Sequence, residues 1–391
     1  MKKKVIQDEI DSIKDDLLKL CKKIHDNPEL SFREYKASSW IIELLKKHGF
    51  EVREGIGGLD TAFKARFKGK KAGPRVVFLA EYDALPEIGH ACGHNIIATC
   101  SVGAAIGLSK IMDSLEGEVI LMGTPAEEGG GGKIILLEQN EFDDVDYALM
   151  IHPTSQRSMI GRGGLAATRL TVEFRGRSAH SSTPETGINA LSAVISVFNG
   201  IDTLRPTFDM KSNINGIITK GGEAPNIIPE YARCDFSVRA KTLTELKALV
   251  KKIRQIVDSA QILTGATATI NVERLYAERY PNMTLAEAFK KNMEYLGEKI
   301  GYPDPNKKIG SSDIGNVTLK IPAIHSYLSI VDNLVNAHSI EFTKASISEK
   351  AMEVAIRGAK GLAMTGYDIF SDDGLREKID KEFQEKVPKI Y

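Results

Sequence analysis

Two histidines and a cysteine lie within five residues of one another in the stretch HACGHN, residues 90–95. Thiolates and neutral imidazoles are good ligands for zinc and acceptable ligands for other first-row metals. Cys92 and His94 are two residues apart in a loop that contains Gly93, so both side chains can turn toward one ion. Cys92 could instead be a buried core thiol, half of a disulfide, or a nucleophile assisted by a histidine.

Acidic residues and a further histidine follow three apolar runs elsewhere in the chain. These are RVVFLA (75–80) before Glu81, Tyr82 and Asp83, EVILMG (118–123) before Glu127 and Glu128, and YALMI (147–151) before His152. Carboxylates complete the ligand sets of divalent metals. Adjacent glutamates on an extended chain point in different directions, so one can bind metal while its neighbour holds a water as general base.

Two competing motifs can be tested on their spacing. EEGGGGK, residues 127–133, is similar to a phosphate-binding loop, but that motif needs glycine at position 127 and serine or threonine at position 134. The chain has Glu127 and Ile134 there, so this interpretation fails. A nucleophilic pair of Cys92 with His90 or His94 stays open, although it gives the acidic residues no role.

The three apolar runs predict buried, parallel-type strands, because each is short, continuous and bounded by polar residues. Helical patterns lie between the runs, and this alternation indicates an α/β fold with a mainly parallel mixed sheet flanked by helices. In such sheets ligands bind outside the carboxyl ends of the strands. The strands should therefore deliver acids and an imidazole to one edge, beside HACGHN, and this convergence is the main argument for a site.

The pattern of the chain changes after residue 164. Apolar and polar residues alternate from Thr168 to Arg175, as in a strand with one buried face. The following elements predict the order strand, helix, strand, strand, helix, strand, which is that of a ferredoxin-like α+β unit. Helix and strand patterns like those of the first 164 residues resume near residue 284. We therefore expect one discontinuous domain, residues 1–164 and 281–391, with a second domain, residues 165–280, inserted into it.

Composition excludes several classes of protein. Lys and Arg together number 52, as do Asp and Glu, so no excess of basic residues points to nucleic acid or to an anionic membrane as a partner. No apolar run has the length of a signal peptide core or a membrane span, and we expect a cytoplasmic protein. Four cysteines in 391 residues do not indicate a disulfide framework in a reducing compartment, which disfavours a disulfide for Cys92.

Several motifs, taken together, resemble those of the dinuclear metallopeptidases and amidohydrolases of peptidase family M20, which include aminoacylases, carboxypeptidase G-type enzymes and auxin-conjugate hydrolases. The resemblance covers nearly the whole chain and rests on IHDNPELSFREYKAS, EYDALPEIGHACGHN, TPAEEGGGGK, IHP, GRSAHSSTPETGINAL, GGEAPNIIPEYARCDFSVRA, GSSDIGNV and NAHSIEF, in the family's order. Asn95 and NAHSIEF look closer to the branch of p-aminobenzoyl-glutamate hydrolase and β-alanyl-lysine dipeptidase. The resemblance implies that the inserted domain is a lid and dimerisation domain.

The resemblance also implies a site with two divalent metal ions, zinc or manganese. Cys92 would bridge the two ions, and the other ligands would be His94, Glu128, His152 and His338.

Five further residues receive roles from the resemblance. Glu127 would be the general base, and Asp83 a carboxylate that orients a ligand. His180 would be catalytic, because in dimeric relatives this histidine reaches the partner's active site and stabilises the oxyanion. Asn226 and Arg239 would contact the substrate, the arginine as a fork for its carboxylate.

The leading hypothesis is a homodimeric enzyme that hydrolyses the amide bond of an N-acyl amino acid or a dipeptide, through a metal-activated water and Glu127. Two alternatives are a catalytically inactive small-molecule-binding homologue and a hydrolase with Cys92 as its nucleophile. Bound metal would argue against the first alternative, and inhibition by chelators against the second.

Overall fold

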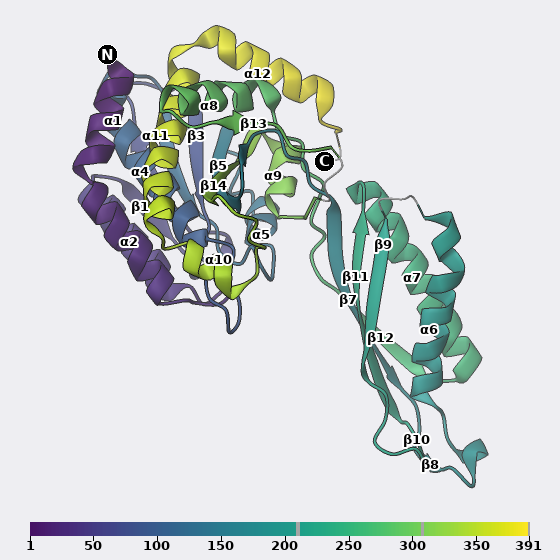
Figure 1. Ribbon diagram of the computed structural model, residues 1–391. Coiled ribbons are helices and arrows are strands. Elements are labelled where there is room, and N and C mark those ends of the chain that lie inside the picture. Colours follow the sequence, from purple (N-terminus) through teal and green to yellow (C-terminus); the bar gives the residue numbers. More distant parts are fainter. Residues whose placement is uncertain (209–211, 306–308, 390–391) are drawn as a thin grey trace. The chain divides into compact units, whose positions relative to one another are not determined.

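The computed structural model describes residues 1–208, 212–305 and 309–389, and the chain divides into two units (Figure 1). The first unit consists of Met1–Gly163 and Arg279–Tyr391, and the second of Gly164–Glu278. The first unit is therefore discontinuous in sequence, with the second inserted between its two segments.

An eight-stranded mixed sheet lies at the centre of the first unit, among the described residues. In spatial order its strands are β1 (Glu51–Glu54), β2 (Phe63–Lys68), β4 (Glu118–Gly123), β3 (Arg75–Ala80), β5 (Tyr147–Ser155), β14 (Ala323–Val331), β6 (Ser158–Met159) and β13 (Ile300–Gly301). The inner strands β4, β3, β5 and β14 are parallel to one another, and β2 is antiparallel to both of its neighbours. The predicted mainly parallel sheet is thus confirmed.

Helices cover both faces of this sheet (Figure 1). They are α1 (Lys2–Ser12), α2 (Lys14–Asp26), α3 (Tyr35–Lys47), α4 (His94–Ser109), α5 (Gly132–Glu138), α8 (Met283–Tyr295), α9 (Ile314–Lys320), α10 (Ile340–Ala345), α11 (Glu349–Ser371) and α12 (Asp373–Lys386). The larger core joins one face to α1–α4, α8 and α11, and the smaller core joins the other face to α5 and α9.

Helix α4 is buried along its whole length, which explains why its sequence is apolar on all sides. Gly103 and Gly107 allow this close packing. A Cβ atom at Gly103 would lie 2.9 Å from side-chain atoms of Leu17 and Ala359, and one at Gly107 would lie 2.5 Å from Ile10. The helix whose first residue is His94 is therefore held firmly between α1, α2 and α11.

The second unit is a four-stranded antiparallel sheet with two helices on one face. The sheet order is β12 (Thr267–Val272), β7 (Ala166–Arg175), β11 (Tyr231–Ala240) and β9 (Asn213–Lys220), with α6 (Ala190–Leu204) and α7 (Leu243–Thr264) packed against it. Two short strands, β8 (Ala179–His180) and β10 (Ile227–Ile228), pair separately. The order of elements confirms the predicted ferredoxin-like unit. Thr242 and Glu245 form a capping box that starts α7.

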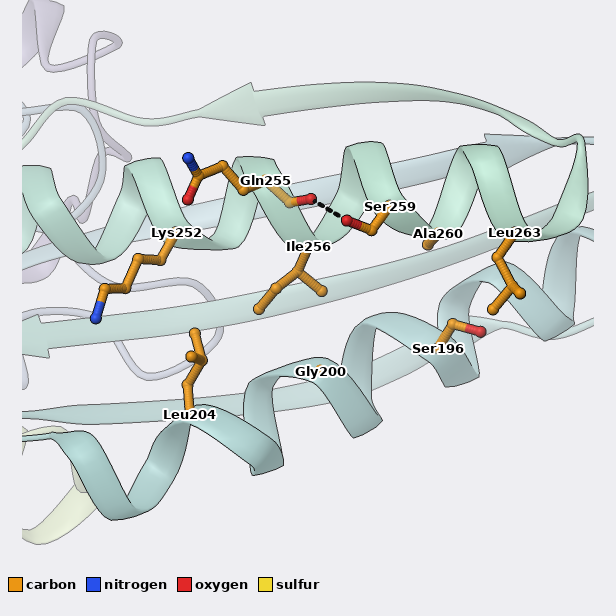
Figure 2. A pocket seen from close by; sticks show the side chains of 9 residues that line it. All are labelled: Ser196, Gly200, Leu204, Lys252, Gln255, Ile256, Ser259, Ala260 and Leu263. Atoms are coloured by element: carbon orange, nitrogen blue, oxygen red, sulfur yellow. Dashed lines mark hydrogen bonds between the residues drawn. The ribbon is translucent and has the colours of Figure 1, made fainter.

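A groove of about 420 Å³ runs between α6 and α7 (Figure 2). Leu204, Ile256 and Leu263 give it an apolar lining. At Gly200 the two helices approach so closely that a Cβ atom would lie 2.6 Å from Ile256. Ile262, also on α7, is 87% exposed.

The strand that carries His152 is longer than the sequence pattern indicates. The apolar run ends at residue 151, but β5 continues to Ser155, because its later residues pair with Tyr327, Leu328 and Ser329 of β14. His152 therefore lies inside a strand rather than in the loop after it. No helix among the described residues is long and apolar enough to cross a membrane.

Candidate metal centre

The predicted ligands of the first unit meet at one edge of its sheet. Asp83 follows β3, Glu127 and Glu128 follow β4, and His152 lies near the end of β5. His94 is the first residue of α4, and Cys92 lies just before it. His338 comes from the loop between β14 and α10, where its N–H donates to the carbonyl of Ala91 at 2.9 Å.

Cys92 faces two histidines. Its Sγ atom lies 3.7 Å from Nε2 of His152 and 3.4 Å from Nε2 of His338. The turn that presents it depends on Gly93, which has φ +76°, and a Cβ atom there would lie 2.5 Å from Pro153. A side chain at position 93 would push the loop away from the strand that carries His152.

His94 lies among carboxylates. Its Nδ1 is 3.0 Å from Asp83 Oδ1, and its Nε2 is 3.4 Å from Glu81 Oε2 and 3.8 Å from Glu128 Oε1. Burial opposes a charge on this ring, but the hydrogen bond to Asp83, the proximity of Cys92 and the charges of Asp83 and Glu81 outweigh it and raise the pKa of His94 well above its usual value. The surroundings therefore stabilise a cation at this point.

Potential ligand atoms form two groups that share Cys92. Atoms of Cys92, His94 and His152 lie within 4.8 Å of one another, and so do atoms of Cys92, Glu128 and His338. His338 Nε2 is 3.5 Å from Glu128 Oε2. The first group adds two imidazoles to the thiol, and the second adds a carboxylate and an imidazole, all of which are side chains that bind divalent metals.

Two buried ligand atoms have no hydrogen-bond partner in the part of the chain that the structure describes. They are Nε2 of His94 and Oε1 of Glu128. Burying such atoms without a partner is costly, and a cation between them would satisfy both. The donor set, with sulfur, nitrogen and oxygen atoms, suits zinc and is acceptable to manganese. The residues present thus fit a divalent metal centre.

Oxygen acceptors orient two of the histidines. Nδ1 of His94 faces Asp83, and Nδ1 of His152 lies 2.6 Å from the carbonyl oxygen of Pro153. A proton on Nδ1 therefore leaves Nε2 of each ring for a metal. Burial is the main cause that lowers the pKa of His152, to about 3, and the charge of His94 lowers it further. His152 is thus a neutral imidazole at neutral pH, which is the form that binds metal.

Burial raises the pKa of the Cys92 thiol far above its usual value, and the charge of Glu128 raises it further, while a hydrogen bond to His94 lowers it. The thiol therefore keeps its proton at neutral pH until a cation displaces it.

A buried network of charged side chains lies close to Glu127. Lys133 Nζ lies 2.5 Å from Glu81 Oε1 and 2.8 Å from Asp313 Oδ1, and all three side chains are at most 1% exposed. Burial raises the pKa of Glu127 well above its usual value, and the nearby charges of Glu81, Glu128 and Asp313 raise it further. A carboxyl group in this environment is suited to take up and release a proton.

Glu34 also contacts this region, from the start of α3. Its Oε1 accepts hydrogen bonds from the N–H groups of Phe32 and Ala126, both at 2.9 Å, and its Oε2 accepts one from the hydroxyl of Thr61 at 2.8 Å. Phe32 and Ala126 have φ of +65° and +60°, in the left-handed region that non-glycine residues avoid. One buried oxygen therefore holds two strained turns, and the second immediately precedes Glu127.

Arginine and tyrosine side chains lie on the other side of His152. Tyr327 is the register partner of His152 on β14, and its ring centroid is 5.4 Å from that of His152. Nη1 of Arg279 donates to the Tyr327 hydroxyl at 2.8 Å and also to Nδ1 of His325. The guanidinium of Arg162 lies 4.8 Å from the centroid of the Tyr327 ring.

Three predicted site residues belong to the second unit. His180 lies on β8, where its Nδ1 is 2.8 Å from the hydroxyl of Ser182, and the carbonyl of Asn226 accepts a hydrogen bond from the N–H of Ser181. Arg239 lies at the other end of β11, opposite Ala167.

The length of β11 separates these residues within the unit. Ile227 of β10 pairs with His180 and precedes Tyr231, the first residue of β11, whereas Arg239 lies eight residues beyond Tyr231 (Figure 1). At about 3.3 Å per residue, that part of the strand alone spans roughly 26 Å. His180 and Arg239 of one chain therefore cannot contact the same small substrate.

His90 has a structural environment. It is 1% exposed, its Nε2 lies 3.1 Å from the carbonyl oxygen of Ile24, and its ring stacks on His25 with centroids 6.4 Å apart. Burial, and next the charge of His94, lower the pKa of His90 to about 3. The geometry matches a role in holding the loop against α2.

Several residues near the centre received no role from the sequence. They are Glu34, Lys133, Arg162, Arg279, Asp313 and Tyr327. Glu81 carried the same signal as Asp83, since both follow β3 directly. The six residues without a predicted role come from segments that lie near the centre only through tertiary packing.

The chain is similar to several known proteins. A family model described as a peptidase dimerisation domain matches residues 160–264. The Xaa-Arg dipeptidase of Mus musculus is 37% identical over 394 residues, which cover 97% of this chain and 91% of that protein. One of the subunits of the p-aminobenzoyl-glutamate hydrolase of Escherichia coli (strain K12) is 26% identical over 458 residues, covering 97% of this chain and 94% of that protein.

A solved structure shows the same fold. It is that of a dinuclear metal-binding peptidase of the M20 family from Bacillus subtilis, with a TM-score of 0.69 and 21% identity, and the match covers 90% of this chain and 98% of that one.

Proposed function

Since the chain belongs to peptidase family M20, whose members are peptidases and amidohydrolases, we propose that it hydrolyses the amide bond of an N-acyl amino acid or a dipeptide. The chain is a metal-dependent hydrolase of amide bonds. We further propose that it holds two divalent ions, zinc or manganese. The proposed ligands are Cys92, His94, Glu128, His152 and His338.

One observation carries the proposal: two groups of potential ligand atoms share the thiol of Cys92. A single thiol placed between two such groups has no evident purpose in a protein that binds a small molecule without turnover. Glu127 adds to this argument, because a carboxyl group with a raised pKa next to the ligands is what a hydrolase needs. These features favour an enzyme over an inactive homologue.

Bound ions supply Lewis-acid activation of the scissile carbonyl and of the hydrolytic water. Glu127 takes a proton from that water and delivers it to the leaving nitrogen. Asp83 holds His94 through Nδ1 at 3.0 Å, so that the ring keeps its orientation. Burial opposes the charge of Asp83, but its hydrogen bond to His94, the charge of His94 and its hydrogen bonds to Glu128 N–H and Ser31 lower its pKa to about 2.

A hydrolase with Cys92 as nucleophile is the competing proposal. The histidines at 3.4 and 3.7 Å would allow it on geometry alone. A reactive cysteine needs a lowered pKa, however, and here burial and the charge of Glu128 raise the pKa of Cys92. The surroundings suit a thiol that is deprotonated by metal binding, and they disfavour a free nucleophile.

We propose a homodimer that joins through the second unit. The match to a peptidase dimerisation domain supports this, as do the apolar side chains that line the groove between α6 and α7 and the side chain of Ile262 on α7, which is 87% exposed. A second copy would remove this apolar surface from water.

The separation of His180 from Arg239 fits the homodimer. If both contact one substrate, they come from different subunits, and we propose that His180 stabilises the oxyanion in the partner's active site. Arg239 would hold the substrate's carboxylate, with Asn226 as a further contact. A cytoplasmic location remains our proposal, supported by four cysteines that are all free thiols.

Replacing Glu127 tests the proposed chemistry. Glu127→Gln keeps the size of the side chain but removes the base, so kcat for N-acyl amino acids and dipeptides should fall about 10²- to 10⁴-fold. Metal content, measured by plasma mass spectrometry after loading with zinc or manganese separately, should stay near two ions per chain. Glu116→Gln, at a residue 60% exposed, is the matched control.

Two results would count against the proposal. Unchanged turnover by Glu127→Gln would exclude Glu127 as the base. Full activity of the wild-type protein after removal of all metal by a chelator would favour the nucleophilic cysteine instead.

A further inference from the structure

A third group of potential ligand atoms lies beside the two groups that share Cys92. It is formed by Glu81, Glu127 and Asp313, whose atoms lie within 4.8 Å of one another. The chain supplies its own cation to this group, because Nζ of Lys133 lies 2.5 Å from Oε1 of Glu81 and 2.8 Å from Oδ1 of Asp313. The group thus has the acidic side chains of a further metal site, with an ammonium group in place of an ion.

Hydrogen bonds at the start of α5 hold Lys133 in this place. Its backbone N–H donates to Oδ2 of Asp313 at 3.0 Å, while its Nζ donates to Oδ1 of the same carboxylate. The carbonyl of Ala126 accepts hydrogen bonds from the N–H groups of Gly131 and Gly132, at 3.0 and 3.4 Å. The loop between β4 and α5 is therefore closed on itself just before Lys133, and the ammonium group is fixed at both ends of its side chain.

The acidic group needs a positive charge. Carboxylates this close repel one another, and Glu81, Asp313 and Lys133 are at most 1% exposed, so water screens them little. Burial opposes a charge on Lys133, but the charges of Asp313, Glu81 and Glu127 outweigh it and raise the pKa of Lys133 above its usual value. Oε2 of Glu81 is buried without a hydrogen-bond partner among the described residues, so this carboxylate keeps an oxygen that can bind an ion.

A divalent ion in this place would interfere with the base. Carboxylate oxygens are the ligands that manganese and magnesium prefer, and an ion held by all three acids would bind an oxygen of Glu127. That oxygen would then be unable to take a proton from the hydrolytic water. The ammonium group of Lys133 balances the acids by ion pairing and forms no coordination bond.

We propose that Lys133 is a positioning residue, whose ammonium group fills a third cation site and so keeps divalent ions from binding Glu127. The proposal rests on the proposed function, in which Glu127 is the base of amide hydrolysis. Once the ammonium group is removed, Glu81, Glu127 and Asp313 should bind a divalent ion that prefers oxygen ligands.

The test counts the ions that each variant binds. Lys133→Ala removes the ammonium group and leaves room for an ion. After loading with manganese and removal of unbound ions by gel filtration, this variant should hold about three ions per chain, against about two in the wild type, by plasma mass spectrometry. The double variant Lys133→Ala/Asp313→Ala also loses a ligand of the third ion, so it should return to about two ions.

Lys64→Ala is the matched control. Lys64 is also a buried lysine, 2% exposed, and its Nζ lies 3.1 Å from Oε2 of Glu141 and 3.0 Å from Oδ1 of Asp144. Those two acids keep Arg53 and Arg66 as partners when Lys64 is lost. This control should therefore stay at about two ions per chain, although it also loses a buried cation.

Urea unfolding at several manganese concentrations repeats the count in a way that tolerates a weakened fold. Each ion bound on folding adds equally to the slope of the unfolding free energy against the logarithm of manganese concentration. The slope for Lys133→Ala should be about one and a half times that of the wild type. An equal slope with two ions per chain would overturn the proposal, and so would failure of the variant to fold at any manganese concentration, since a third ion should replace the lost charge.

Activity tests whether the third ion reaches the base. At saturating manganese, kcat of Lys133→Ala should be at least about tenfold below that of the wild type, and lowering free manganese until two ions remain should restore part of it. A variant that holds three ions and keeps the wild-type kcat would overturn the positioning role. If the wild-type protein hydrolyses no amide, the proposed function fails, but the ion counts still decide whether Lys133 fills a cation site.

Discussion

Glu34 offers a sharp test of how the fold supports the centre, because its carboxyl group can be replaced without changing its shape. Two backbone N–H groups donate to Oε1, and the hydroxyl of Thr61, which can rotate, donates to Oε2; these are its side-chain hydrogen bonds among the described residues. In Glu34→Gln the amide oxygen can keep both N–H donors, and the Thr61 hydroxyl can turn to accept from the new NH₂ group. The variant should therefore keep the turn at Ala126 and a kcat close to that of the wild type.

The stability of this variant should nevertheless depend on pH in a different way. Burial, and next the charge of Asp83, raise the pKa of Glu34 from 4.5 to about 7. A raised folded-state pKa means that the folded protein favours the neutral carboxyl group. The stabilisation is complete below pH 4.5 and is lost as the pH rises through about 7. A shift of this size corresponds to about 3 kcal/mol of unfolding free energy. Glutamine does not ionise, so Glu34→Gln should not lose this stability as the pH rises.

Urea unfolding of the metal-free protein, followed by circular dichroism at about pH 4.5 and about pH 8, measures this difference. The unfolding free energy of Glu34→Gln relative to wild type should rise by about 3 kcal/mol between the two pH values. Glu43→Gln, at an exposed position of α3, controls for the substitution itself. Parallel pH curves for Glu34→Gln and wild type would refute the argument.

Three further predictions concern the centre and the dimer. Cys92→Ser should lower the metal content after loading, measured by plasma mass spectrometry, and full occupancy would exclude a bridging thiolate. Lys133→Met should destabilise the fold by about 3–5 kcal/mol in urea unfolding at about pH 8, because it leaves Glu81 and Asp313 buried without a cation; a loss below about 1 kcal/mol would contradict this. An equimolar mixture of His180→Ala and Glu127→Ala subunits, exchanged by mild denaturation, should regain about a quarter of wild-type activity if His180 acts across the dimer, and none if it acts within its own chain.

The sequence predicted the architecture because its signals are local. Short apolar runs bounded by polar residues identified β3, β4 and β5, and alternation over residues 168–175 identified β7, whose buried residues alternate with partly buried or exposed ones. The strand-end rule also placed Asp83, Glu127 and Glu128 at one edge, where the structure brings them near Cys92 and His94.

Other features of the centre depend on tertiary packing. Asp313 reaches Lys133 only because the starts of α5 and α9 lie side by side, and 180 residues separate the two in sequence. Arg279 reaches Tyr327 through the return of the chain from the second unit. Neither contact has a periodic pattern or a motif that could reveal it. The extension of β5 past His152 likewise depends on pairing with β14, which the apolar run at 147–151 could not show.

The loop between α2 and α3, residues 27–34, joins the N-terminal helices to the site. The carbonyl of Glu29 accepts a hydrogen bond from the N–H of Ala84 at 2.8 Å, Ser31 donates to Asp83 at 3.0 Å, and Glu34 holds Ala126. These three contacts hold the loops after β3 and β4 against residues 29–34. A protease cut within residues 27–34 would remove these contacts and so release the backbone beside Asp83 and Glu127.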